Sequence, residues 1–216
     1  MGISLKKGQG VSLKKESGLL TRLTIGLGWD VAKPKELLNK IFDKSEDYDL
    51  DAICFMLDAD GYIGNLGEVD NGRWTLRGGD IIFFNSMRHP SGAVELTGDN
   101  RTGDGDGDGD DEQIIVQLDK LPKNYQRLVF VVSIYDGIKK GQNFGAVENA
   151  FIRAVDNNGK ELARYDISGN ASFASYHSII FAEVVRENGD WSFNAIGNPH
   201  HSDRFAEILK NYLPTQ

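Results

Sequence analysis

An apolar strand that ends in aspartate occurs twice in this chain, as Arg22-Leu-Thr-Ile-Gly-Leu-Gly-Trp-Asp30 and as Arg127-Leu-Val-Phe-Val-Val-Ser-Ile-Tyr-Asp136. A similar second strand follows each copy, as Asp51-Ala-Ile-Cys-Phe-Met-Leu-Asp58 and as Asn149-Ala-Phe-Ile-Arg-Ala-Val-Asp156. Two halves with related strand pairs would pack as a pseudo-symmetric sandwich. Apolar strands that end in aspartate are also common in unrelated chains, so an internal repeat and a chance similarity both stay open.

Short apolar segments separated by turn signals make up most of the chain. The clearest hairpin signal is Asn188-Gly189, because this dipeptide accepts the positive φ angles of a type I′ turn. Helical patterns occur at 35–44 and at 202–212, the second behind a Ser202 cap. The strand patterns lie at 10–14, 23–27, 52–57, 81–84, 113–117, 127–134, 150–155, 161–167, 178–187 and 191–196. This pattern predicts a mainly β fold, a β-sandwich of two packed sheets with a few short helices.

The composition is that of a soluble globular protein, with 40% hydrophobic and 26% charged residues. A chain of 216 residues can bury a core as one large domain or two small ones. The single cysteine, Cys54, cannot form an internal disulfide, which fits a reducing cytosol. The sequence has no signal-peptide pattern and no stretch of roughly 20 apolar residues. We therefore expect a cytoplasmic protein without membrane insertion.

Negative charge is concentrated in one acid-rich segment, residues 98–112. Its seven acids and one base, Arg101, give it −6 of the formal net charge of −8. Nucleic-acid binding needs clustered Lys and Arg, so an acidic chain is unsuited to it. An anionic membrane surface is disfavoured for the same reason. The local concentration of charge indicates a site.

Alternating glycine and aspartate suit this segment for calcium. Ca²⁺ takes about six to eight hard oxygen ligands in flexible geometry, and glycine lets the backbone fold tightly around an ion. Mg²⁺ needs stricter octahedral geometry and Zn²⁺ prefers nitrogen and sulfur ligands, so both fit less well. A solvated acidic linker is the alternative. The candidate ligands of the segment are Asp99, Asn100, Asp108, Asp110, Asp111 and Glu112.

The segment is not an EF-hand, although Asp104, Asp106 and Asp108 followed by Gly109 match the opening of an EF-hand loop. The twelfth position of such a loop is Ile115, where a bidentate glutamate is required. The flanking patterns are strands rather than helices.

Further acids upstream extend the candidate site. Asp49 and Asp51 are two residues apart and therefore share one face of a strand, and Asp30 ends the preceding strand. These three could meet the acid-rich segment at one end of a sandwich and complete the coordination shell. Asp58 and Asp60 are better explained by the turn at Asp60-Gly61.

Several motifs together resemble the TerD-type tellurium-resistance and stress-protein family over about residues 3 to 197. They are Ile3-Ser-Leu-Lys-Lys-Gly8, Gly26-Leu-Gly-Trp-Asp30, Asp49-Leu-Asp-Ala52, the acid-rich segment, Glu148-Asn-Ala-Phe-Ile-Arg153 and Ala163-Arg-Tyr-Asp166. The resemblance implies a calcium-binding β-sandwich of the bacterial cytoplasm, associated with tellurite resistance and stress tolerance. It also implies that Asp30, Asp49, Asp51 and the acids of the segment lie near the metal. We expect calcium to order a surface for partner proteins of the same stress system.

Measured against this family, we expect a single TerD-like domain over residues 1–216. Two stretches look inserted, a helical one at about 33–46 and another at about 62–79. A C-terminal helix is expected at about 202–213.

Catalysis is not expected. His89 and His177 have no evident partner acid or nucleophile, and the adjacent His200 and His201 cannot share one face of a strand or helix. Cys54 lies inside an apolar strand, where a thiol is unreactive. Two rival functions stay open, a metal-dependent phosphoester hydrolase and a module that binds a small molecule such as a nucleotide.

Overall fold

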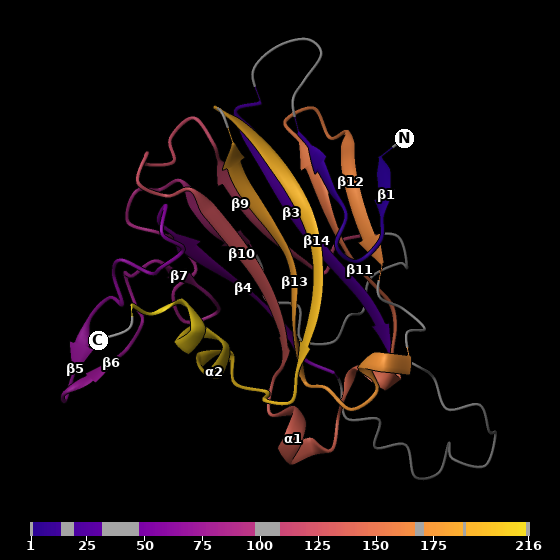
Figure 1. Cartoon of the computed structure of the whole chain (residues 1–216). Helices are drawn as coiled ribbons and strands as arrows, with labels where there is room; N and C mark the ends of the chain where they lie inside the picture. The colour runs from indigo at the N-terminus through magenta and orange to yellow at the C-terminus, as the bar shows by residue number, and fades with distance from the viewer. Residues whose placement is uncertain are drawn as a thin grey trace, which may run out of the picture.

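The apolar strands pair into two six-stranded sheets, which pack face to face (Figure 1). The computed structural model describes residues 2–13, 20–31, 48–97, 109–166, 171–187 and 189–214. The first sheet has the order β1 (Ile3–Leu5), β12 (Glu161–Asp166), β11 (Val147–Asp156), β3 (Arg22–Val31), β9 (Glu112–Gln117) and β8 (Val94–Thr97). The second has the order β2 (Gly10–Ser12), β14 (Asp190–His200), β13 (Ser178–Glu187), β10 (Arg127–Ile134), β4 (Leu50–Leu57) and β7 (Ile81–Ile82). The predicted β-sandwich is confirmed.

Alternating burial along the strands shows how the core is built. On β3, Leu23, Ile25, Leu27 and Trp29 enter the main core between the sheets. On β4 every residue is buried, because this strand is covered on both faces. Ala52, Cys54 and Met56 belong to the main core, and the residues that alternate with them belong to a second cluster. That second cluster includes Ile208 and Leu209 of α2 (Phe205–Leu209), which lies on the outer face of the second sheet.

The two halves of the chain share the exchange of their second strands, although the hairpins that follow are ordered differently, as β3-β9-β8 in the first sheet and as β10-β13-β14 in the second. The first half places β3 and β9 in the first sheet and β4 and β7 in the second. The second half does the reverse, with β10 and β13 in the second sheet and β11 and β12 in the first. As a result β3 pairs with β11, and β10 pairs with β4. The second strand of each half, β4 or β11, therefore pairs with the first strand of the other half. This reciprocal exchange favours an internal repeat over a chance similarity.

Equivalent turns follow the two second strands. The Asp58 Oδ1 atom accepts hydrogen bonds from the backbone N–H groups two and four residues later, both at 2.9 Å. Asp156 Oδ1 accepts the corresponding pair at 2.7 and 3.0 Å. Gly61 and Gly159 occupy the same place in these turns with φ of 85° and 76°, a region that favours glycine. Asp58 and Asp60 therefore form a turn, as predicted.

The C-terminal helix is shorter than predicted. Instead of one helix over 202–213, α2 spans Phe205–Leu209 and a 3₁₀ turn, η4 (Lys210–Tyr212), follows it. Ser202 is not the helix cap, because the residue at that position is Arg204. The Ser202 carbonyl accepts a hydrogen bond from Ser178 Oγ at 2.7 Å, which ties this residue to β13 and delays the helix.

Further expectations have mixed outcomes. The helix expected within 33–46 lies outside the described residues. The stretch 62–79 holds an unpredicted hairpin, β5 (Val69–Asp70) and β6 (Arg73–Trp74), which projects from the sandwich (Figure 1). Short helical turns also occur at α1 (Gly137–Lys140), η2 (Phe144–Ala146) and η3 (Ala171–Phe173). Within the described part of the chain, each helix is too short or too polar to span a bilayer.

The repeat predicts equal roles for the two aspartate turns. Replacement of Asp58 or Asp156 by Ala removes two backbone hydrogen bonds in each case. We expect each variant to lose about 1 to 2 kcal/mol of the free energy of unfolding, measured by urea titration. A loss at one turn with none at the other would contradict their equivalence.

Candidate functional site

Three consecutive carboxylates at the end of the acid-rich segment point to three different parts of the fold. Asp110 contacts the outer face of the first sheet, Asp111 contacts the backbone of β3, and Glu112 contacts the second sheet. The chain bends at Asp111 before β9 begins, which frees these side chains from strict alternation. Each of the three therefore has its own surroundings.

Glu112 joins the two sheets. Its side chain is only 3% exposed, and its Oε2 atom accepts a hydrogen bond from the backbone N–H of Ala52 in β4 at 2.6 Å. A hydrogen bond to an ionised carboxylate is stronger than one between neutral groups. A buried carboxylate nevertheless requires compensation by further hydrogen bonds or positive charge. Glu112 thus fixes the start of β9 against the start of β4.

Asp111 extends the pairing between β9 and β3. Its backbone N–H donates to the carbonyl of Leu27 at 2.8 Å, and its Oδ2 atom accepts the N–H of Trp29 at 2.9 Å. The carboxylate takes the place of the carbonyl that a continued strand would supply. Asp111 is thereby held beside Asp30, the next residue after Trp29.

Asp110 is held by a cation of the protein itself. Its Oδ1 atom lies 2.8 Å from Arg153 Nε of β11, and its Oδ2 atom accepts a hydrogen bond from Gln113 Nε2 at 3.1 Å. The Asp110 side chain is 2% exposed. It rests on Gly26, where an added Cβ would lie 2.2 Å from the carboxylate. This close packing explains why the position is glycine.

The structure brings the start of β4 to the same end of the sandwich. Asp51 is 9% exposed and precedes Ala52, the residue whose N–H contacts Glu112. The carbonyl of Asp49 accepts the N–H of Tyr135 at 2.7 Å, at the end of β10. Asp30 lies opposite Glu148 at the end of β3. The backbone positions of Asp30, Asp49 and Asp51 therefore lie at the end of the fold that also holds Asp111 and Glu112.

Other predicted ligands lie outside the described residues, namely Asp99, Asn100 and Asp108. The residues that flank them are described, and Thr97 pairs with Gln113, so the acid-rich segment leaves and rejoins the first sheet at this end. In the part of the chain that the structure describes, His, Cys, Asp and Glu side chains form no group of three placed to hold a metal ion.

The donor set nevertheless fits a hard cation. Asp49, Asp51, Asp111 and Glu112 offer only oxygen ligands, as calcium prefers. Trp29 lies beside them with its side chain 2% exposed, and within the described residues its Nε1 atom has no hydrogen-bond acceptor. A buried N–H of this kind requires an acceptor, and the described residues supply none.

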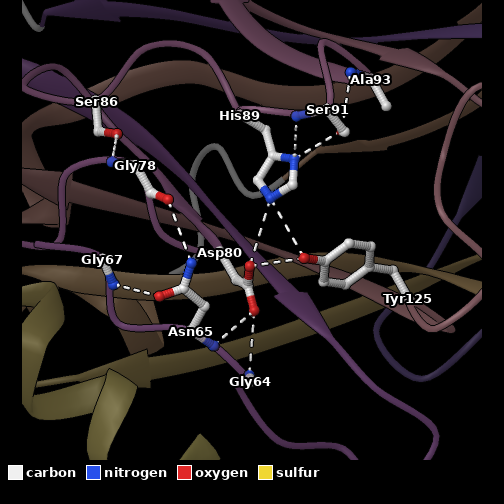
Figure 2. A network of polar contacts seen from close by, with 10 residues as sticks. All are labelled: Gly64, Asn65, Gly67, Gly78, Asp80, Ser86, His89, Ser91, Ala93 and Tyr125. Atoms are coloured by element: carbon white, nitrogen blue, oxygen red, sulfur yellow. Dashed lines mark hydrogen bonds and ion pairs between the residues drawn. The ribbon is translucent and has the colours of Figure 1, made fainter.

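A second polar cluster lies away from this end, under the turn that precedes β8 (Figure 2). The carboxylate of Asp80, 2% exposed, accepts the hydroxyl of Tyr125 at 2.7 Å and the backbone N–H groups of Gly64 and Asn65 at 3.1 and 2.8 Å. His89 Nε2 lies 3.4 Å from the same carboxylate. The expectation that His89 has no partner acid is therefore wrong. Asp80 lies nine residues before it, a spacing that carries no sequence signal.

The cluster has the groups of a hydrolytic triad without the donors such a site needs. Ser91 Oγ lies 2.7 Å from His89 Nδ1, and the N–H of Ser91 donates to the same nitrogen at 3.1 Å. The N–H of Gly92 is bonded to the carbonyl of His89, and that of Ala93 to Ser91 Oγ. The amides around the hydroxyl are all engaged, so they offer no oxyanion hole. His89 is a buried histidine held by hydrogen bonds with Ser91 and Asp80.

Ionisation in this cluster is set by hydrogen bonds. Burial by itself raises the pKa of Asp80, but hydrogen bonds from His89, Tyr125 and the Asn65 backbone outweigh it and lower the pKa overall. Burial and the adjacent Asp80 raise the pKa of Tyr125 to about 12. The cluster therefore holds one anion and one neutral phenol at neutral pH.

The remaining reactive groups have structural surroundings. His177 Nδ1 lies 2.6 Å from the carbonyl of Gln142, and His201 stacks on Tyr176 with ring centroids 4.3 Å apart. Burial and the neighbouring His201 lower the pKa of His200. Cys54 is fully buried, and burial raises the pKa of its thiol, which disfavours the reactive thiolate.

Asp80 gives a pH-dependent prediction. The pKa of Asp80 is lower in the folded protein than the roughly 3.9 of an aspartate in an unfolded chain. The ionised Asp80 therefore stabilises the fold above about pH 3.9, and this stabilisation is lost as the pH falls through the pKa of the folded state. We expect Asp80→Asn to lose about 1 to 3 kcal/mol of the free energy of unfolding at pH 7. The difference from wild type should shrink below about pH 4. Urea titrations at pH 7 and pH 3 measure it, with the exposed Asp60→Asn as a control; an equal difference at both pH values would contradict it.

Comparison with known proteins finds one family over nearly the whole chain. The TerD domain model matches residues 1–212. Tellurium resistance protein TerX of Serratia marcescens is 55% identical, with 99% of this chain and 100% of that protein covered. Stress response protein SCP2 of Bacillus subtilis is 39% identical, with 99% and 100% covered. A solved homologue of a telluride resistance protein (TerD) from Streptomyces coelicolor has the same fold, with a TM-score of 0.61, 22% identity and coverage of 90% of this chain and 99% of that one.

Proposed function

Because the chain belongs to the TerD domain family of tellurium-resistance and stress-response proteins, we propose that it is a calcium-binding protein of a bacterial system of this kind. The site is the end of the sandwich where β3, β4 and β9 meet. The observation that carries the proposal is the convergence of Asp111 and Glu112 on the backbone amides next to Asp30 and Asp51. Two segments that both contain predicted ligands are thereby held together.

The proposed ligands come from three parts of the chain. Asp111 and Glu112 belong to the acid-rich segment, Asp49 and Asp51 to the start of β4, and Asp30 to the end of β3. Asp99, Asn100 and Asp108 are the further candidates from the segment. Asp110 is left out, because Arg153 and Gln113 already hold both of its oxygens.

Charge explains why a cation would matter to this end of the fold. The carboxylates of Asp51 and Glu112 are 9% and 3% exposed, so water screens them poorly. When bound, calcium would supply positive charge against them. The same residues hold β3, β4 and β9 in register, so loading would also stabilise the fold. The surface at this end would then be fixed, and we propose that it serves partner proteins of the same stress system in the cytoplasm.

A non-enzymatic role fits the chemistry better than hydrolysis does. The candidate ligands offer only oxygen atoms. Among the described residues, the hydroxyl–imidazole–carboxylate cluster of Ser91, His89 and Asp80 lacks donors for an oxyanion and lies at another part of the fold. The names of these relatives describe resistance and stress response rather than a reaction.

Calcium titration calorimetry on metal-stripped protein tests the proposal. We expect binding in the range of about 10⁻⁷ to 10⁻⁵ M, together with a rise in melting temperature. Glu112→Gln keeps an acceptor for Ala52 but removes the charge, so we expect about tenfold weaker binding or worse. Glu95→Gln, on β8 of the same sheet, should bind as wild type does. Absence of both heat and thermal stabilisation in the wild type would contradict the proposal.

A further inference from the structure

Arg153 reaches across the first sheet to the end of the acid-rich segment. It belongs to β11, and Asp110 lies two residues before the start of β9, with β3 lying between these two strands. Arg153 Nε lies 2.8 Å from Asp110 Oδ1, and Arg153 Nη1 lies 3.6 Å from Glu161 Oε2 of β12. The guanidinium is 26% exposed and the Asp110 side chain 2% exposed. The pair is therefore shielded from solvent far more than an ordinary surface ion pair.

Two glycines of β3 leave room for the contact between Arg153 and Asp110. Gly26 of β3 lies under the Asp110 carboxylate, and Gly28 lies under the ring of Phe151 and beside the carbonyl of Gly109. A Cβ at Gly26 would lie 2.2 Å from the Asp110 carboxylate, and one at Gly28 would lie 2.4 Å from the Phe151 ring and 2.9 Å from the Gly109 carbonyl. Side chains at either position would separate the acid-rich segment from β11. The β3 sequence thus allows the Arg153–Asp110 contact.

We propose that Arg153 is a positioning residue of the candidate cation site. By holding Asp110 on the outer face of the first sheet, it fixes the register in which the acid-rich segment rejoins β9. That register directs Asp111 to the Trp29 amide and Glu112 to the interior. The inference rests on the proposed function, because its consequence is measured as calcium affinity.

The need for such a residue follows from the sequence of the segment. Asp110, Asp111 and Glu112 are consecutive acids of similar chemistry, and a shift by one residue would exchange their places. In a strand such a shift also moves each side chain to the other face. A guanidinium fixed on one face favours the register that supplies it with a carboxylate at Asp110.

A neighbouring arginine provides a matched control. Arg164 of β12 lies on the same face, with its guanidinium 3.7 Å from the centre of the Phe151 ring and its Nε 2.9 Å from Asp166 Oδ1. Its described ion pair does not involve the acid-rich segment. Replacement of Arg164 therefore removes an arginine and its packing from the outer face without removing the partner of Asp110.

The test is calcium calorimetry on full-length wild type, Arg153→Met, Arg153→Lys, Asp110→Asn, the Arg153→Met/Asp110→Asn double variant and Arg164→Met. Urea titration in calcium-free buffer, at the temperature of the calorimetry, establishes that every variant is folded there. We expect Arg153→Met and Asp110→Asn each to raise the calcium Kd by about tenfold or more. The double variant should show little further loss, because both changes remove one interaction. Arg153→Lys should be intermediate, and Arg164→Met should match wild type.

The outcomes separate this inference from the proposed function. Failure of the wild type to bind calcium would remove both. If the wild type binds calcium and Arg153→Met binds it with the same Kd, Arg153 is a purely structural residue, even if that variant is less stable. This result would overturn the inference and leave the proposed function standing. Tighter binding by Arg153→Met would also overturn it, since Asp110 would then act as a ligand that Arg153 withholds.

Discussion

The contact between the buried carboxylate of Glu112 and the backbone of Ala52 constrains this whole end of the sandwich. It links β9 of one sheet to β4 of the other at 2.6 Å, with the glutamate 3% exposed. A carboxylate in such a place must be compensated, so the surrounding chain cannot be arranged freely. Asp111 and Asp51 are the residues next to Glu112 and Ala52, so this contact also limits where they lie. Trp29 is held in turn by the hydrogen bond from its backbone N–H to Asp111. The proposed function and the role of Arg153 both start from that arrangement.

The reciprocal topology explains why such an end exists. Each half of the chain gives its second strand to the sheet of the other half, so the ends of β3 and β10 and the starts of β4 and β11 meet at one place. Acids at these strand ends therefore converge although they are far apart in sequence. The opposite ends of the second strands carry the equivalent aspartate turns, whose side chains are occupied by local backbone amides. Position along the strand thus separates the aspartates that stabilise turns from those at the opposite strand ends, whose backbone positions lie at one end of the sandwich.

Much of the fold could be predicted from the sequence because its strands are long and apolar, such as β4, β10 and β13. The short strands β1 and β8 and the β5–β6 hairpin are missing from the prediction, although the equally short β2 and β7 are in it. Strands of two to four residues are too short for a periodic pattern to separate them from loops. The C-terminal helix was placed too early, because the bond from Ser178 to the Ser202 carbonyl is a tertiary contact. The concentration of acids at residues 98–112 is visible in the sequence, but the separate direction of Asp110 is not. That direction depends on Arg153, which is 43 residues away in the chain.

The most direct test of the central claim is terbium luminescence, with the lanthanide standing in for calcium and tryptophan as the sensitiser. Trp29 lies at the proposed site, while Trp74 belongs to the projecting hairpin and Trp191 to the start of β14. We expect sensitised emission that calcium displaces, that Trp29→Phe abolishes, and that Trp74→Phe and Trp191→Phe leave largely intact. Emission that survives Trp29→Phe, or that calcium cannot displace, would place the ion elsewhere and contradict the account.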